Sequence, residues 1–161
     1  MKLDSYRIED NISVRNTNTY GKTLVAKKPF KKGDLVFVTY GPIVKEPTIY
    51  TIPISRELFI DPTKPEGNLC QFICHSCDPN LGIKDRNCFA AFKDIKVGED
   101  IAIDYAMIVP QYKSEMTEEN RKCKCGSRIC RGKLGCFDEL TRELKEKYKG
   151  YVSDYLLETE S

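Results

Sequence analysis

The stretch FICHSCDPN, Phe72–Asn80, contains the only histidine in a chain of 161 residues. His75 lies between two cysteines, Cys74 and Cys77, and the turn-forming Asp-Pro-Asn ends the stretch. Three interpretations are open at this point: a metal site, a cysteine nucleophile with its base, or a segment of shaped backbone.

The composition excludes several classes of protein. Lys and Arg number 26 against 24 Asp and Glu, so no broad basic surface is indicated and we expect no direct nucleic-acid partner. No apolar run approaches the roughly 20 residues that a membrane span needs, and the N-terminal MKLDSYRIED has no apolar signal segment. We therefore expect an intracellular protein, cytoplasmic or nuclear, without a membrane partner. We therefore expect its eight cysteines to be free thiols or metal ligands rather than disulfides.

Short β signals separated by turns dominate the first part of the chain. Four runs rich in β-branched and aromatic residues are predicted strands: TLVAKKPF, LVFVTYG, CFAAFKDI and IAIDYAMIV, at 23–30, 35–41, 88–95 and 101–109. Pro42, Pro47 and Pro53 divide the segment between the second and third runs into short extended pieces, because proline cannot donate to a ladder. Many short strands at close spacing predict a mostly β, irregular fold.

The C-terminal part has a different character. Residues 138–158 are predicted to be helical, with Asp138 as the cap. Leu140, Leu144 and Tyr148 recur four residues apart on one face, which indicates a helix packed on the domain rather than a partner-binding helix.

Cys123, Cys125 and Cys130 have the spacing C-x-C-x4-C in a polar segment. Three thiolates this close can converge on one tetrahedral zinc ion, and a structural zinc site needs a fourth ligand. The candidates for that ligand are Cys136, six residues on, and the distant Cys77 and Cys70.

Four sequence blocks occur in a defined order: YGKTLVAKKPFKKGDLVFVTYG, GNLCQFICHSCDPN, AFKDIKVGEDIAIDYA and CKCGSRICRGKLG, which start at Tyr20, Gly67, Ala91 and Cys123. Together they resemble a SET-domain protein lysine methyltransferase with a post-SET zinc segment. The second block matches the pattern N-H-S-C-x-P-N except at its first position, the third matches G-E-x-x-x-x-D-Y, and the fourth matches C-x-C-x4-C.

The resemblance implies a SET domain at 5–110, a post-SET zinc segment at 120–136 and a C-terminal helical extension at 138–158. The expected fold consists of small β-sheets with a C-terminal pseudoknot, in which the Asp104-Tyr105 segment threads the His75 segment. S-adenosylmethionine would bind on one face, and the substrate lysine would enter from the other. No pre-SET region precedes these blocks, so a minimal, stand-alone enzyme is expected.

The same resemblance assigns the catalytic residues. Tyr105 matches the catalytic tyrosine, whose hydroxyl would lie near the transferring methyl group. Tyr40 is a weaker catalytic candidate that would line the lysine channel. Ile103 lies where an aromatic residue influences product multiplicity. A tyrosine there can hold a water that blocks added methyl groups and isoleucine cannot, so we expect di- or trimethylation to be permitted.

The resemblance also assigns the cofactor-binding and metal-binding residues. Gly21, Lys22 and Thr23 would approach the cofactor through their backbone, although the second glycine usual in this loop is absent. His75 belongs to the adenosine-binding turn, mainly through its backbone. Cys74 lies at the position that helps to hold the methionine moiety, and Tyr105 also faces the cofactor. Cys77 is implied as the fourth zinc ligand beside Cys123, Cys125 and Cys130.

Cys74 stands where asparagine is expected, and a thiol is a poor hydrogen-bonding group, so we expect weak binding of S-adenosylmethionine. Asp104 is expected to be structural, within the knot. A Cys-His nucleophile is disfavoured because no carboxylate that would orient His75 is identifiable and adjacent residues of an extended segment point to opposite faces.

The function expected from the sequence is methyl transfer from S-adenosylmethionine to a lysine of a histone or another protein. The alternative is a catalytically weak SET-like module, stapled by zinc, that binds a peptide or a cofactor.

Overall fold

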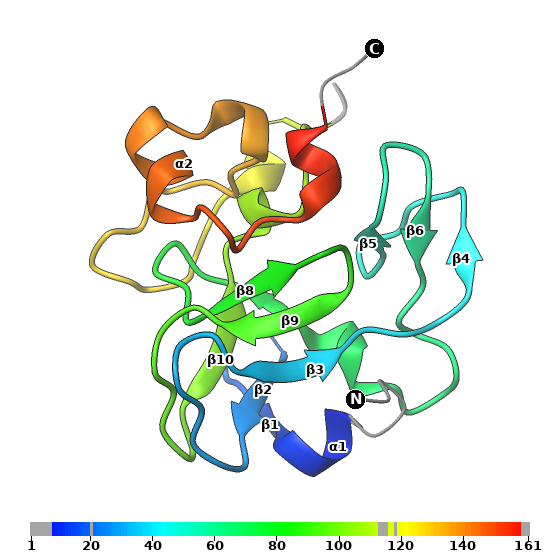
Figure 1. Ribbon diagram of the computed structural model, residues 1–161, viewed down its shortest axis with the longest axis vertical. Helices are drawn as coiled ribbons and strands as arrows, with labels where there is room; N and C mark the ends of the chain where they lie inside the picture. The colour runs from blue at the N-terminus through cyan, green and yellow to red at the C-terminus, as the bar shows by residue number, and fades with distance from the viewer. Residues whose placement is uncertain (1–7, 20, 113–115, 118, 159–161) are drawn as a thin grey trace.

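The computed structural model of the protein describes residues 8–19, 21–112, 116–117 and 119–158 (Figure 1). The expected start of the SET domain at residue 5 lies outside these residues. Two small β-sheets account for most of the regular structure.

The larger sheet has seven strands, six of them in the order β1-β2-β10-β8-β9-β3, with β7 paired to β10 off this path. Their bounds, in chain order, are β1 (Ile12–Asn16), β2 (Lys22–Ala26), β3 (Leu35–Val38), β7 (Cys74–His75), β8 (Leu81–Lys84), β9 (Cys88–Ala91) and β10 (Asp100–Ile103). The smaller sheet has the order β4-β6-β5, with β4 (Ile43–Val44), β5 (Ile52–Pro53) and β6 (Phe59–Ile60).

Helical structure is confined to short pieces. Two are α-helices, α1 (Ile8–Asn11) and α2 (Arg142–Lys147). The others are 3-10 turns: η2 (Leu69–Phe72), η3 (Tyr105–Met107), η4 (Glu119–Arg121), η5 (Phe137–Glu139) and η6 (Asp154–Leu157). The prediction of a mostly β fold with short C-terminal helices is therefore confirmed.

Strand β10 is the centre of the expected pseudoknot. It runs parallel to both β7 and β8, since Ile103 pairs with His75 on one edge and with Leu81 on the other. The loop between these two strands is bonded to β10 through Asn80. The Asn80 side chain donates to the Asp100 carbonyl at 2.8 Å and accepts from the Ala102 amide at 3.0 Å. The opening stretch FICHSCDPN is thus a piece of backbone shaped around β10.

The predicted strand at 101–109 is shorter than expected. It ends at Ile103 because the Asp104 carboxylate accepts the Ala106 amide at 3.0 Å and caps η3. The chain therefore turns sharply just where Tyr105 leaves the sheet.

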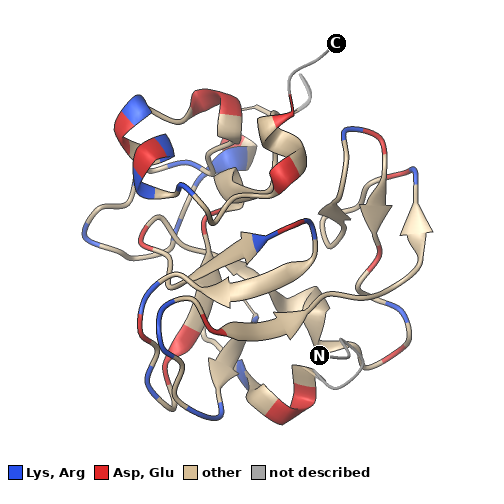
Figure 2. Cartoon of the chain, viewed as in Figure 1, with Lys and Arg blue, Asp and Glu red and all other residues tan. Residues whose placement is uncertain are grey.

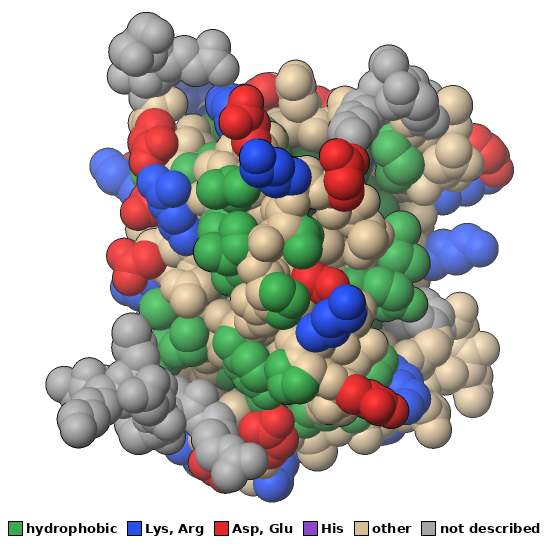
Figure 3. Space-filling model, turned by 90° about the vertical axis from the view of Figure 1, so that its right-hand side faces the viewer, with side chains coloured by type: hydrophobic (Ala, Val, Ile, Leu, Met, Phe, Trp, Pro, Cys, Tyr) green, Lys and Arg blue, Asp and Glu red, His purple; other side chains and the backbone are tan. Residues whose placement is uncertain are grey.

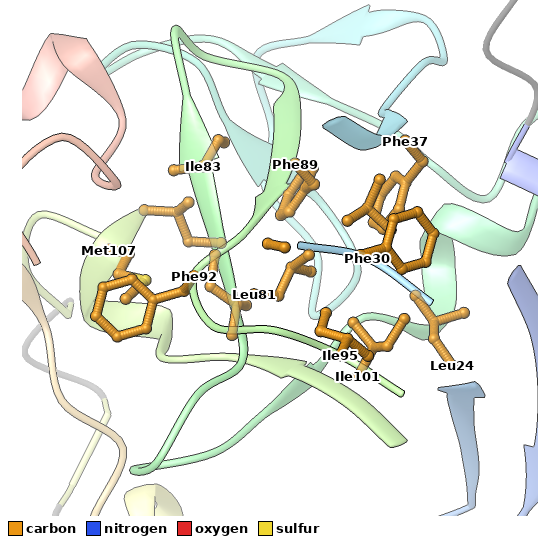
Figure 4. Packing of buried hydrophobic residues seen from close by; sticks show 14 of the residues in the cluster. Leu24, Phe30, Phe37, Leu81, Ile83, Phe89, Phe92, Ile95, Ile101 and Met107 are labelled. Atoms are coloured by element: carbon orange, nitrogen blue, oxygen red, sulfur yellow. The ribbon is translucent and has the colours of Figure 1, made fainter. Parts of the chain in front are cut away.

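The hydrophobic core lies between the larger sheet and the segments that cover it (Figure 4). Phe37 of β3 stacks on Phe89 of β9 with ring centroids 4.8 Å apart. Leu24, Leu81 and Ile101 are fully buried and come from three neighbouring strands. Consecutive residues are buried on β2, at Thr23 and Leu24, and on β8, from Leu81 to Ile83, so these parts of the sheet are covered on both faces.

The C-terminal tail packs on the domain, as predicted, with α2 and η6 lying beyond β8 and β9 in Figure 1. Tyr148 is fully buried, and the Tyr151 carbonyl accepts the Ile83 amide at 3.1 Å. The predicted cap was wrong: Asp138 lies in η5, and Thr141 caps α2 by accepting the Leu144 amide at 3.2 Å. A threonine hydroxyl one residue before the helix can reach the third amide of the first turn, which Asp138 is too far back to do.

The surface carries both signs of charge along its loops (Figure 2). Hydrophobic side chains gather on the face shown in Figure 3. The segment that holds the smaller sheet contributes exposed apolar residues, of which Ile49 is 91% and Ile43 62% exposed. Within the described part of the chain, no helix has the length and apolar character needed to cross a bilayer.

Candidate active site and metal centre

Tyr105 follows β10 and contacts two residues of the stretch Phe72–Asn80, namely Ile73 and His75. Its hydroxyl donates to the Ile73 carbonyl at 3.1 Å, and its amide donates to Nδ1 of His75 at 3.1 Å. The two rings lie 5.1 Å apart between centroids. Burial, and then the neighbouring Cys74 and Tyr112, raise the pKa of the Tyr105 phenol above its ordinary range. Tyr105 is therefore a neutral hydroxyl at physiological pH, able to orient and stabilise but not to act as a phenolate base.

The predicted cofactor-binding residues come together next to this tyrosine. The Cys74 thiol donates to the Lys22 carbonyl at 3.3 Å and to the Phe72 carbonyl at 3.4 Å. Thr23, the next residue of β2, is buried. Burial raises the pKa of the Cys74 thiol, so it stays protonated. The start of β2 and the start of β7, 52 residues apart, thus form one edge of the site.

Gly21 stands at the entrance to β2 with φ +85°, a conformation that favours glycine. Its carbonyl accepts both the amide and the hydroxyl of Thr17 at 2.6 Å. The single glycine of this loop is therefore the residue that turns the chain into β2.

His75 uses both ring nitrogens inside the protein. Nδ1 accepts the Tyr105 amide, so the proton lies on Nε2, 3.4 Å from the Cys77 sulfur. Burial lowers the pKa of His75 to about 4, against the opposing effect of Asp104, and the ring is neutral. His75 thus donates to a thiol that belongs to the cysteine cluster described next. The side chain, and not only the backbone, has a structural task.

Four cysteine sulfurs form a compact cluster, with all ligand atoms within 4.8 Å of one another: Cys77, Cys123, Cys125 and Cys130. The sulfurs of Cys77 and Cys123 are 3.8 Å apart. Tetrahedral Zn–S bonds of about 2.3 Å imply S···S separations of about 3.8 Å, so the donor set and its spacing fit zinc.

Hydrogen-bond donors surround these sulfurs. The amide of Arg131 points at Cys77 Sγ and the amide of Gly132 at Cys130 Sγ, both at 3.4 Å. Burial acts to raise the pKa of Cys125, but hydrogen bonds led by that of the Ser127 side chain outweigh it and hold the pKa below the ordinary value. Such donors favour thiolates, which are the form that binds metal. Burial acts in the opposite direction and raises the pKa of Cys77 and Cys123.

The other candidates for the fourth ligand are placed differently. Cys136 is buried just before η5, and Cys70 is buried in the core, where desolvation raises its pKa to about 11. Neither joins the cluster among the described residues. Cys70 behaves as a small buried hydrophobic residue, whereas Cys88 is only half-buried.

Ile103 and Tyr40 occupy different surroundings. Ile103 is fully buried in the core and pairs with His75, one residue from the Tyr105 turn. Tyr40 is 41% exposed at the end of β3, where its carbonyl accepts the Asn68 side chain at 2.9 Å. Their roles in a lysine channel stay predictions.

The sequence interpretation missed three of the residues that organise the site. Asn80 completes the bonding of β10, and Arg131 and Tyr148 both bind the buried carboxylate of Asp104. Asp104 was expected to be structural. Arg131 directly follows Cys130, the last cysteine of the C-x-C-x4-C motif, so its position in the sequence could have pointed to the site. Tyr148 belongs to a helical apolar stripe, and nothing in the sequence indicates a partner for its hydroxyl.

The comparisons with known proteins agree with this geometry. The family model of the SET domain matches residues 21–106, more than half of the chain. The chain belongs to the SET-domain family.

Curated relatives of this SET chain include two fungal proteins named "Histone-lysine N-methyltransferase, H3 lysine-36 specific". The protein from Chaetomium globosum is 29% identical over 157 residues, covering 84% of this chain and 17% of its own length. That from Yarrowia lipolytica is 31% identical over 147 residues, covering 78% of this chain and 18% of its own length. This SET chain therefore spans less than a fifth of either relative.

A solved structure, "KRYPTONITE in complex with mCHH DNA, H3(1-15) peptide and SAH", has a TM-score of 0.65 at 23% identity. It covers 78% of this chain and 29% of its own. The likeness supports the SET fold.

Proposed function

We propose that this chain is a protein-lysine N-methyltransferase that uses S-adenosylmethionine. The observation that carries the proposal is the convergence of Tyr105, the Cys74–His75 strand and the Lys22–Thr23 strand at the end of β10. These are the positions that the family resemblance assigns to catalysis and to the cofactor. The names of the relatives, all histone-lysine N-methyltransferases, support the same activity.

The chemistry needs positioning more than reactive groups. S-adenosylmethionine, when bound, supplies an electrophilic methyl group for an in-line displacement by a neutral amine. The chain's part is to align the lysine nitrogen, exclude water and stabilise the cationic centre. A neutral Tyr105 hydroxyl, fixed at both ends of the residue by Ile73 and His75, suits that task.

We further propose that Cys77, Cys123, Cys125 and Cys130 hold a structural zinc ion. Cys77 lies three residues after Cys74, so the ion would fasten the C-terminal segment to the cofactor edge of the site. With four protein ligands the ion would have no open position, which favours a structural rather than a catalytic role.

We propose a protein lysine as substrate, with histones as the first candidates because the relatives bear that name. We also propose a SET domain at 5–110, a post-SET segment at 120–136 and a C-terminal helical extension at 138–158. The proposed location is intracellular, in the nucleus or the cytoplasm. The proposed partner is a protein rather than a nucleic acid.

One observation favours the alternative, a catalytically weak binding module. The Cys74 thiol donates to two carbonyls of the protein and cannot replace the hydrogen bonds of an asparagine. Cofactor affinity, and with it turnover, would then be low.

Label transfer separates the two functions. The protein, with its zinc retained, is incubated with methyl-labelled S-adenosylmethionine against histones and a whole-cell lysate. Transfer by the wild type that is lost in Tyr105→Phe supports the enzyme. Transfer only by Cys74→Asn supports the weak module, and absence of both transfer and cofactor binding contradicts the proposal.

A further inference from the structure

Asp104 is a fully buried carboxylate, and its two oxygens have different partners. Oδ1 accepts the Ala106 amide at 3.0 Å and so caps the turn that carries Tyr105. Oδ2 accepts the hydroxyl of Tyr148 at 2.8 Å and pairs with Nη1 of Arg131 at 2.7 Å. We call Asp104, Arg131 and Tyr148 the Asp104 cluster.

The Asp104 cluster joins three parts of the molecule that are distant in sequence. Arg131 belongs to the cysteine segment, and its own amide points at Cys77 Sγ. Tyr148 ends α2 in the C-terminal tail and packs edge-on against Phe92, with centroids 5.5 Å apart. Asp104 immediately precedes Tyr105. The tail and the cysteine segment therefore meet on the residue next to the proposed catalytic tyrosine.

A buried carboxylate keeps one orientation only while its hydrogen bonds are complete, because an unpaired lone pair is costly away from water. The bonds to Oδ2 thus fix the rotation of the carboxylate that presents Oδ1 to Ala106. If the hydrogen bonds to Oδ2 are lost, the carboxylate can rotate, and Oδ1 no longer accepts the Ala106 amide that caps η3. Tyr105, the first residue of η3, would then lose its defined direction.

We propose that Tyr148 and Arg131 are positioning residues for Tyr105, acting through Asp104, and that the C-terminal tail is part of the catalytic unit. The proposal rests on the proposed methyltransferase function. It goes beyond that function because it gives the tail, outside the matched SET region, a role in the rate of transfer.

The tail supplies a matched control. Tyr155 is also a buried tyrosine of the tail, and its hydroxyl donates to the Ile108 carbonyl at 2.5 Å. Tyr148→Phe and Tyr155→Phe each remove one buried hydroxyl and keep the ring. Only the first touches Asp104, whereas the second acts on Ile108, the residue that ends η3. Equal effects of the two variants would therefore show that the contact with Asp104 has no specific role, and a larger effect of Tyr148→Phe would show that it has one.

The experiment measures kcat and the KM for S-adenosylmethionine in wild type and both variants, each with bound zinc verified. We expect Tyr148→Phe to lower kcat about tenfold, since small misplacements of reacting groups carry large rate penalties, while KM changes less than about twofold. Tyr155→Phe should keep both parameters within about twofold of wild type. Arg131→Lys, which keeps the charge but removes the guanidinium whose Nη1 pairs with Asp104, should also lower kcat.

A second measurement does not depend on activity. Hydrogen exchange of the Ala106 amide should be about tenfold faster in Tyr148→Phe than in wild type, and unchanged in Tyr155→Phe, because that amide is the one Oδ1 holds.

The outcomes distinguish the two claims. A wild type without methyl transfer would overturn the proposed function, and the exchange comparison would still decide whether the cluster holds η3. Equal exchange at Ala106 in all three proteins, or equal loss of kcat in both tyrosine variants, would overturn the positioning role.

Discussion

At position 74 a thiol takes the place of an amide, and its single proton is directed at backbone carbonyls of Lys22 and Phe72. Asparagine at this position would add two donors and an acceptor at the cofactor edge. The residue that departs from the family pattern at this position therefore lies at the proposed cofactor edge, where we expect the departure to affect cofactor affinity.

Cys74→Asn is predicted to bind S-adenosylmethionine more tightly than the wild type. One recovered hydrogen bond of about 1 to 3 kcal/mol corresponds to about a 5- to 150-fold lower Kd. Isothermal titration calorimetry measures the Kd for S-adenosylmethionine. Cys88→Asn is the control, since Cys88 is half-buried in β9 and lies outside the site. Equal affinity of Cys74→Asn and wild type would refute the explanation.

Ile103 leads to a prediction about product multiplicity. Because isoleucine cannot hold a water molecule through a hydroxyl, we predict that dimethyl- or trimethyl-lysine accumulates. Mass spectrometry of the substrate at exhaustive turnover tests this, and a product that stops at one methyl group would contradict it.

At the scale of elements, the cysteine segment connects to the sheet by way of Cys77, which belongs to the loop between β7 and β8. A metal there would tie the C-terminal part to the strand that carries the site. Metal binding and folding of the segment are then linked.

Removal of zinc is predicted to lower the melting temperature and to lower cofactor affinity. Cys123→Ser should bind less than one zinc per chain and behave like the chelated wild type, whereas Cys88→Ser should retain its metal. Elemental analysis measures the zinc content of each protein, and thermal melts measure its melting temperature. Full zinc content in Cys123→Ser would show that the cluster is not the metal site.

Helix α2 is only six residues long, so its capping residue matters to the tail. Thr141→Ala should destabilise the protein by about 1 kcal/mol in urea unfolding, because the Leu144 amide loses its acceptor. Asp138→Ala, at the position where the sequence suggested the cap, should change stability by less than about 0.5 kcal/mol. The reverse order would show that the helix starts elsewhere.

At the scale of the whole molecule, local patterns predicted several strands and the C-terminal helices but not their arrangement. The β-branched runs gave the strands β2, β3, β9 and β10, since burial on a sheet favours those residues. The pseudoknot came only from the family resemblance. Parallel pairing of β10 with both β7 and β8 is a long-range arrangement that no local propensity encodes.

The residues of the site divide in the same way. Positions within motifs, such as Cys77 and Tyr105, were found from spacing and resemblance. Tyr148 was recognised only as an apolar stripe residue, because the partner of its hydroxyl, Asp104, is 44 positions away. Buried polar contacts between distant segments depend on the tertiary fold.

The central claim is that Tyr105 supports methyl transfer to lysine. The most direct measurement is amino-acid analysis of a substrate labelled by the zinc-bound protein with methyl-labelled S-adenosylmethionine. We predict that the label is recovered as ε-N-methylated lysine with the wild type, and that Tyr105→Phe lowers its rate of formation by at least about 100-fold. Label recovered on another residue type, or equal rates for both proteins, would contradict the account.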